Sequence, residues 1–205
     1  MEIYLHIGLH KTGTSFLQKV IFPKINGIDF YNPKLNDLKN IKPKIKTLIS
    51  NESLAGQPYS FNQTDRYKTL NFIKKLYPNA NIIFVKRNPK NWINSLYKQY
   101  IRGGGVYSFQ KWFNDIFDID FLYDKYENEL KKKFKKILIL DYEELKEKPD
   151  LFIKKLCSYI GVDVPVYENK TIYSSYTNQQ MIICRFFNRI GFKKKLNPVW
   201  YFGRH

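Results

Sequence analysis

The feature that most constrains this chain is an apolar strand near its start that leads through a glycine loop into a helix. The run Ile3 to Ile7 predicts the strand, and the apolar spacing of Phe16 to Ile21 predicts the helix, which Pro23 ends. Between them, Gly8 and Gly13 have the G-x-x-x-x-G spacing of a phosphate-binding loop. Small residues there let backbone N–H groups converge on phosphate oxygens at the positive end of a helix dipole.

The position of the lysine distinguishes this loop from an ordinary nucleotide P-loop. In the G-x-x-x-x-G-K-[ST] pattern the lysine directly follows the second glycine, whereas here Thr14 holds that place. Lys11 lies inside the loop instead, and Ser15 keeps the Ser/Thr position. The loop therefore indicates a site for a phosphorylated ligand. In this site the lysine would reach a different oxygen of the ligand from the one that the lysine of an ordinary P-loop reaches. A glycine turn that merely connects strand and helix is the alternative.

Strands and helices alternate along most of the chain. Further strands, the first two running into polar turns, are expected in the segments 27–33, 45–54, 81–86 and 136–140, and further helices over 65–77, 89–102, 122–134, 151–159 and 178–189. This order predicts an α/β fold of three layers, α/β/α, around a central and mostly parallel sheet. We expect one domain spanning residues 1–205, with a core over about 1–162 and a C-terminal lid or edge over about 163–205.

The segment "KTGTS", from Lys11 through Thr12, Gly13 and Thr14 to Ser15, resembles the 5′-phosphosulfate loop of sulfotransferases that use 3′-phosphoadenosine 5′-phosphosulfate (PAPS). The family pattern is a Lys-[Ser/Thr]-Gly-Thr-[Thr/Ser] core after a strand, and every position matches. Arg87 at a strand end and Ser95 eight residues later resemble the family's 3′-phosphate motif, where an arginine forks onto phosphate oxygens. The resemblance covers roughly Ile3 to Val162. It implies a P-loop nucleoside-triphosphate-hydrolase-like fold, PAPS as donor, 3′,5′-ADP as product, and no metal.

Transfer of a sulfuryl group to a hydroxyl requires charge stabilisation on the leaving phosphate and a base. We assign the first role to Lys11. The resemblance places the base after the third strand, where Glu52 stands, since family members carry His or Glu there. One alternative is that Glu52 is merely a carboxylate at the N-terminus of a helix, where the helix dipole favours it. The other is that His10, inside the loop, is the base. His6, within the first strand, is expected to be structural.

The chain has a formal net charge of +17, from 35 Lys and Arg against 18 Asp and Glu. Such an excess favours polyanionic partners, although lysine as a default surface residue explains it equally well. We expect an acceptor with a hydroxyl group on a carbohydrate or glycan, with an acidic glycan as one candidate. The C-terminal tail, with Trp200, Tyr201 and Phe202, is a candidate for membrane contact, for a sugar site or for a packed edge. Arg204 in "YFGRH" resembles the Gly-Arg of the family's late nucleotide-covering loop.

Two other functions remain as alternatives. A small ATP-dependent kinase would keep the fold, but the lysine is displaced and only Asp141 after a strand is placed to hold Mg²⁺. A non-enzymatic nucleic-acid-binding protein would explain the charge, but no familiar recognition motif is present and specific nucleic-acid binding is not expected. Because the chain lacks a long apolar run and a signal-like start and has only Cys157 and Cys184, we expect a cytoplasmic protein of unassigned oligomeric state.

Overall fold

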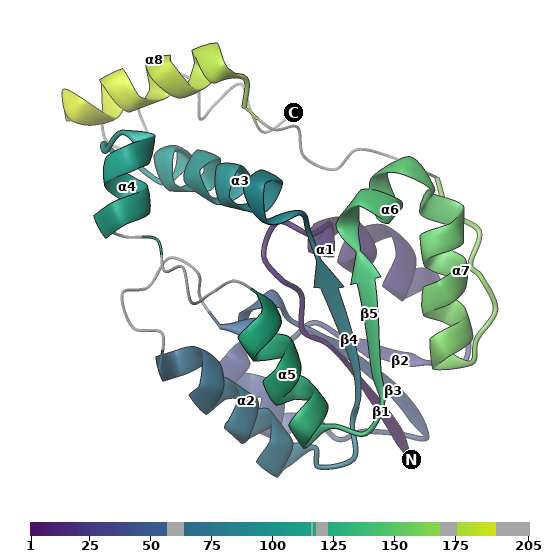
Figure 1. The fold of residues 1–205 in the computed structure, drawn as a ribbon. Coiled ribbons are helices and arrows are strands. Elements are labelled where there is room, and N and C mark those ends of the chain that lie inside the picture. Colours follow the sequence, from purple (N-terminus) through teal and green to yellow (C-terminus); the bar gives the residue numbers. More distant parts are fainter. Residues whose placement is uncertain (57–63, 116, 118–122, 169–175, 192–205) are drawn as a thin grey trace.

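A five-stranded parallel sheet forms the centre of the fold, with the strand order β2-β3-β1-β4-β5 (Figure 1). Its strands are β1 (Glu2–His6), β2 (Asp29–Tyr31), β3 (Lys46–Ser50), β4 (Asn81–Lys86) and β5 (Ile137–Asp141). All four neighbouring pairs are parallel. The structure is a computed structural model, and it describes residues 1–56, 64–115, 117, 123–168 and 176–191. The predicted strands and the parallel sheet are confirmed.

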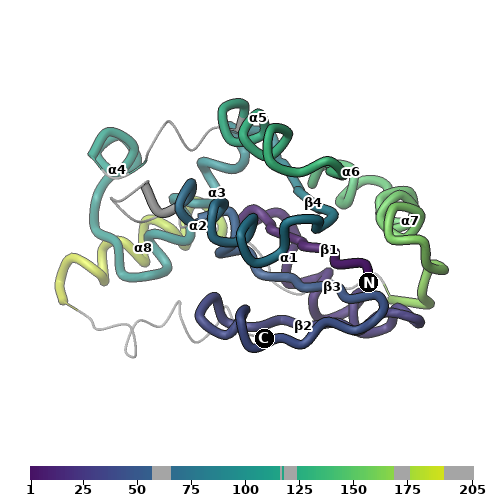
Figure 2. Tube along the Cα trace, turned by 90° about the horizontal axis from the view of Figure 1, so that it is seen from below, coloured from purple at the N-terminus to yellow at the C-terminus, as the bar shows by residue number. Residues whose placement is uncertain are grey.

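Helices cover both faces of this sheet, which confirms the three-layer α/β/α class (Figures 1 and 2). One face packs against α2 (Thr64–Leu76), α3 (Pro89–Arg102) and α5 (Tyr123–Lys133), and α4 (Phe109–Asp115) packs against α3 through Trp112. The other packs against α1 (Thr14–Phe16) with the turns that continue it, α6 (Tyr142–Glu147) and α7 (Pro149–Ile160). The last helix is α8 (Asn178–Arg189), which Figure 2 shows, with α4, at the end of the molecule away from α7.

Strand β4 shows why the sequence folds into this arrangement. Ile82 and Phe84 point into the hydrophobic core on the α2 and α5 side, while Ile83 and Val85 point into the core on the α7 side. All four side chains are fully buried. A strand covered on both faces needs this continuous apolar run, because alternate residues face opposite sides of a sheet.

The segment after the glycine loop differs from the single helix that its apolar spacing predicts. It forms the short α1, then a wider turn of π-helix over Leu17–Ile21, and then a tighter 3-10 turn over Phe22–Lys24. Pro23 lacks an N–H group and cannot continue a regular helix, which accounts for the end of the segment. Helix α4 was not expected from the sequence, because only Trp112 among its seven residues is buried and no periodic pattern marks it.

The C-terminal region is described only in part. Helix α8 packs against α3 through a small core of Ile101, Tyr176, Met181 and Cys184. Residues 169–175 and 192–205, which include Trp200, Tyr201, Phe202 and Arg204, lie outside the described residues. Within the described part of the chain, no helix is both long enough and apolar enough to cross a membrane.

The two faces of α7 give a direct test of this layer arrangement. Phe152 is fully buried in the core between α7 and the sheet, whereas the neighbouring Leu151 is 42% exposed. We expect Phe152→Ala to lower the free energy of unfolding by about 3–5 kcal/mol through lost burial and a cavity. The matched control Leu151→Ala is expected to change it by about 0.5 kcal/mol or less. Urea unfolding followed by circular dichroism measures both, and equal losses would contradict the assignment of the buried face.

Candidate functional site

The loop between β1 and α1 is packed on both sides too closely for side chains at its two glycines. A Cβ atom at Gly8 would lie 3.0 Å from the Cα of Glu52, and one at Gly13 would lie 2.5 Å from Leu145 Cδ2. Both glycines also have positive φ angles, 79° and 81°, which other residues rarely adopt. The loop is therefore clamped between the turn after β3 and helix α6.

Two threonine hydroxyls stiffen this loop from inside. Thr12 Oγ1 donates to the carbonyl of Leu9 at 2.6 Å, and Thr14 Oγ1 donates to the same carbonyl at 3.2 Å. Thr12 is fully buried, so its hydroxyl serves the loop's own structure. What Thr12 can offer a ligand is its backbone N–H. Because the first turn of a helix lacks intrahelical acceptors, the amides of Thr14 and Ser15 are also available to an anion.

Lys11 has a strained backbone that Arg87 supports. Its φ angle is 64°, and among the described residues it is the one non-glycine residue with a positive φ. Arg87 Nη1 donates to the Lys11 carbonyl at 2.9 Å. Such a conformation costs about 1–3 kcal/mol and persists only where the surroundings hold it in place, often at functional sites.

Arg87 itself is held at the carboxyl end of β4. Its guanidinium lies over the ring of Tyr142, with Cζ 4.6 Å from the ring centre. Its Nε is buried and has no hydrogen-bond partner in the described structure. The side chain is thus fixed by the Lys11 carbonyl and the Tyr142 ring while part of its donor capacity is unused. Ser95 is buried on α3, one turn after Trp92, whose indole N–H donates to the His10 carbonyl at 2.8 Å.

Glu52 lies beside the loop. It begins the 3-10 turn η4 (Glu52–Ala55) after β3, where the Asn51 side chain accepts from the Ser53 N–H at 2.7 Å and donates to the Pro33 carbonyl at 2.7 Å. Its Oε1 lies 3.8 Å from His10 Nε2. Burial raises the pKa of Glu52, and the nearby Lys11 charge opposes that rise.

The two histidines near the loop are both neutral at pH 7. Burial lowers the pKa of His10 to about 4, with a further contribution from the charge of Lys11. Burial alone lowers the pKa of His6 to about 3, and its Nδ1 is 2.7 Å from Ser50 Oγ. His6 thus pairs with β3 inside the sheet, which fits the structural role expected of it. The contact of His10 with Glu52 is between a neutral ring and a carboxylate.

The structure adds Arg102, which the sequence did not single out. The pKa of Lys11 is lowered first by burial, then by the charge of Arg102 and then by that of Arg87, against the opposing effect of Glu52. Arg102 ends α3 and lies over the Tyr176 ring, with Cζ 5.4 Å from its centre. Ser95 and Arg102 are seven residues apart, which is about two helical turns and puts them on one face of α3. This spacing was the signal in the sequence from which Arg102 could have been included among the site candidates.

The arrangement suits an anionic ligand. Lys11, Arg87 and Arg102 put positive charge around the loop, and Glu52 is the one predicted site residue of opposite charge. Within the described ranges, no three His, Cys, Asp or Glu residues are grouped so that they could hold a metal ion.

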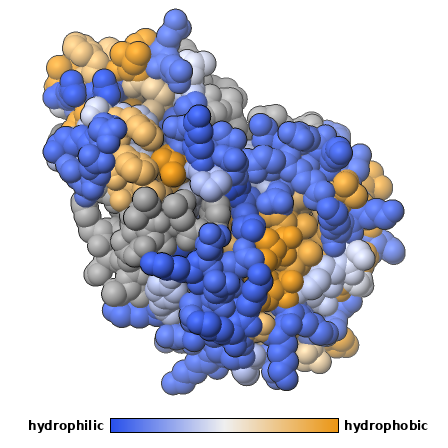
Figure 3. All heavy atoms as spheres, in the orientation of Figure 1, coloured by the Kyte–Doolittle hydropathy of each residue, from blue (hydrophilic) through white to orange (hydrophobic). Residues whose placement is uncertain are grey.

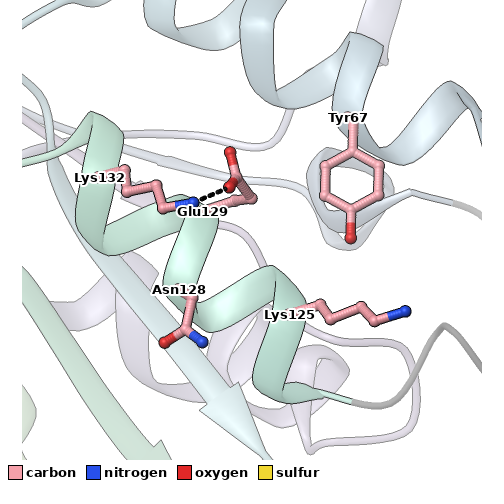
Figure 4. Close-up of a pocket in the computed structure, with 5 residues that line it drawn as sticks. All are labelled: Tyr67, Lys125, Asn128, Glu129 and Lys132. Atoms are coloured by element: carbon pink, nitrogen blue, oxygen red, sulfur yellow. Dashed lines mark hydrogen bonds and ion pairs between the residues drawn. The ribbon is translucent and has the colours of Figure 1, made fainter.

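A separate hollow lies between α2 and α5. It has a volume of about 320 Å³ and is lined by Tyr67, Lys125, Asn128, Glu129 and Lys132 (Figure 4). Lys132 pairs with Glu129 at 2.7 Å, as the dashed line in Figure 4 marks. None of these residues belongs to the predicted site, so the hollow is distinct from the glycine loop.

Comparisons with known proteins identify what this fold and site are similar to. A family model described as a sulfotransferase domain matches residues 4–188. The mouse sulfotransferase SULT7A1, solved in complex with PAP, is 20% identical with a TM-score of 0.55, over 91% of this chain and 64% of its own length. A sulfotransferase from Alicyclobacillus acidocaldarius is 14% identical with a TM-score of 0.53, over 93% and 96%. No curated protein sequence is significantly similar to this chain.

Gly13 and Gly27 form a matched pair that tests the clamped loop. Both have positive φ angles, 81° and 76°, but a Cβ at Gly27 would meet nothing within 4 Å. We expect Gly27→Ala to lower the free energy of unfolding by about 1 kcal/mol through backbone strain alone. Gly13→Ala should cost about 1–3 kcal/mol more, because its methyl group collides with Leu145. Equal losses in urea unfolding would show that α6 does not clamp the loop.

Proposed function

This chain belongs to the sulfotransferase family, and from that premise we propose that it transfers a sulfuryl group from PAPS to an acceptor hydroxyl, leaving 3′,5′-ADP. The observation that carries the proposal is the strained Lys11, held by Arg87 and placed between positive charges and Glu52. The chain spans 64% of the length of the mouse enzyme, whose solved complex contains PAP.

In the proposed donor site, the loop binds the 5′-phosphosulfate and the strand end binds the 3′-phosphate. The Lys11 ammonium and the backbone amides of Thr12, Gly13, Thr14 and Ser15 are the donors for the first group. Arg87, with its unused buried Nε, and the hydroxyl of Ser95 are the donors for the second. The positive charge that lowers the pKa of Lys11 supports this assignment, because a bound anion would relieve the repulsion.

The proposed reaction is an in-line displacement at sulfur. The acceptor oxygen forms a bond to sulfur as the bond between sulfur and the oxygen of the 5′-phosphate breaks, and the hydroxyl proton passes to the Glu52 carboxylate. Lys11 stabilises the charge that develops on the departing phosphate. Positioning of the two reactants by the clamped loop supplies the remainder of the rate enhancement.

Glu52 is a better candidate for the base than His10. Its raised pKa makes it a stronger proton acceptor than an ordinary carboxylate, and its side chain is 41% exposed and so within reach of a substrate. The His10 side chain is 6% exposed, and a pKa of about 4 makes its ring a weak base.

For the acceptor, we propose a hydroxyl on a carbohydrate or glycan, with an acidic glycan as one candidate. The support is electrostatic: the net charge is +17, and cations surround the Lys11 loop.

Nucleotide selectivity tests the donor site. We expect 3′,5′-ADP to raise the melting temperature strongly and 5′-ADP to raise it little, because only the first places a phosphate at Arg87 and Ser95. A ligand at about 100 times its dissociation constant adds about 2.7 kcal/mol of stability. Lys11→Met should weaken the shift, whereas the matched control Lys34→Met, at an exposed lysine, should not. A preference for Mg-ATP would favour the kinase alternative instead.

Exchange of the carboxylate for an amide tests the base. We expect Glu52→Gln to lower the rate of sulfate transfer from radiolabelled PAPS to p-nitrophenyl glycosides by about 100-fold or more, with 3′,5′-ADP binding retained. His10→Gln is expected to lower it much less. The wild-type rate should rise with pH through the raised pKa of Glu52 and then level off, since the base acts when deprotonated. Activity of Glu52→Gln within a few-fold of wild type would overturn this assignment alone.

A further inference from the structure

Helix α8 is apolar on two opposite sides. Its inner side places Met181 and Cys184 in the small core with α3. Its outer side carries a contiguous apolar stripe, which we name the α8 face and which Figure 3 shows as hydrophobic surface at the upper left. Its members are Ile182, Ile183, Phe186 and Ile190, which are 63%, 48%, 59% and 53% exposed. Large apolar side chains gathered in this way mark an interaction surface, whereas single ones do not.

The stripe follows from helical geometry. Ile182, Phe186 and Ile190 are spaced by four residues, and Ile183 stands three residues before Phe186. At about 3.6 residues per turn these four side chains share one side of the helix axis. Burial of Met181 and Cys184 on the other side fixes the rotation of α8, so the stripe points away from α3.

Positive charges predominate in the segments next to the α8 face. The sequence from Arg87 to Asn114, which spans α3 and most of α4, contains no Asp or Glu, and neither does the described segment 176–191. Arg189 Nε donates to the Val106 carbonyl at 3.3 Å, and Arg185 Nη1 contacts the Tyr97 hydroxyl at 3.4 Å. These two arginines therefore tie the edge of α8 to the equally cationic segment around α3.

We infer that the α8 face docks on the surface of an anionic lipid bilayer, with its apolar stripe in the boundary between headgroups and acyl chains. An anionic bilayer offers both an apolar layer and negative charge to a helix of this kind. A second copy of this chain would bring two cationic edges together. A soluble polyanion would leave the apolar stripe in water. The inference does not rest on the proposed sulfotransfer.

Vesicle co-sedimentation tests this inference on the full chain. We expect binding to vesicles that mix phosphatidylcholine with phosphatidylglycerol, and little binding to phosphatidylcholine alone. The double variant Ile182→Ser/Phe186→Ser should bind the mixed vesicles about tenfold more weakly or worse, because it removes apolar burial and keeps every charge. Higher salt should also weaken binding.

The matched control is Ile45→Ser/Val166→Ser, at residues that are 87% and 92% exposed and lie outside α8. It should bind like the wild type. If the α8 double variant does not fold, Ile182→Ser alone takes its place. Equal binding by the α8 variant and the wild type, or no binding to mixed vesicles, would overturn the inference. So would a dimer, measured by light scattering, that the α8 variant dissociates.

Discussion

The arrangement of this molecule depends on the close approach of the β1–α1 loop to its two neighbours. A Cβ atom at Gly8 would lie 3.0 Å from the Glu52 Cα, and one at Gly13 would lie 2.5 Å from Leu145 Cδ2 of α6, so a side chain at either position would have to displace its neighbour. Because both sides are closed, the path of the loop is set by the turn after β3 and by α6 as much as by the loop itself. The same contacts fix the position of the Lys11 backbone and bring the residue near Glu52.

A second constraint is electrostatic. Burial lowers the pKa of Lys11 most, and the charges of Arg102 and then Arg87 lower it further, so the three cations lie near one another although they repel. A folded protein keeps such an arrangement where function requires it, and local conflicts of this kind are expected at sites rather than in the core. Helix α3, which contains no acidic residue, runs from Arg87 at the end of β4 to the small core that it shares with α8.

The elements that the sequence predicted well are those with long apolar runs or periodic patterns. Strand β4 and helices α3 and α7 lie close to where they were expected, because each buries enough side chains to give its sequence a recognisable apolar pattern. Helix α4 has seven residues and a single buried tryptophan, which is too little to distinguish it from a loop. The π and 3-10 turns after α1 have the same apolar spacing as a helix over so short a span, so their geometry could not be predicted.

By itself, the sequence determined the loop motif, the spacing of Arg87 and Ser95, and the alternation of strands and helices, because these are local patterns along the chain. Only the tertiary structure decided that His10 lies 3.8 Å from Glu52, that Arg102 acts on Lys11, and that one side of α8 stays exposed. The first of these follows from the strand order β2-β3-β1-β4-β5, which sets β3 and β4 on either side of β1, and the other two follow from the way α3 and α8 pack. Residues far apart in sequence meet at the carboxyl ends of these three strands, and no local sequence pattern encodes their proximity in space.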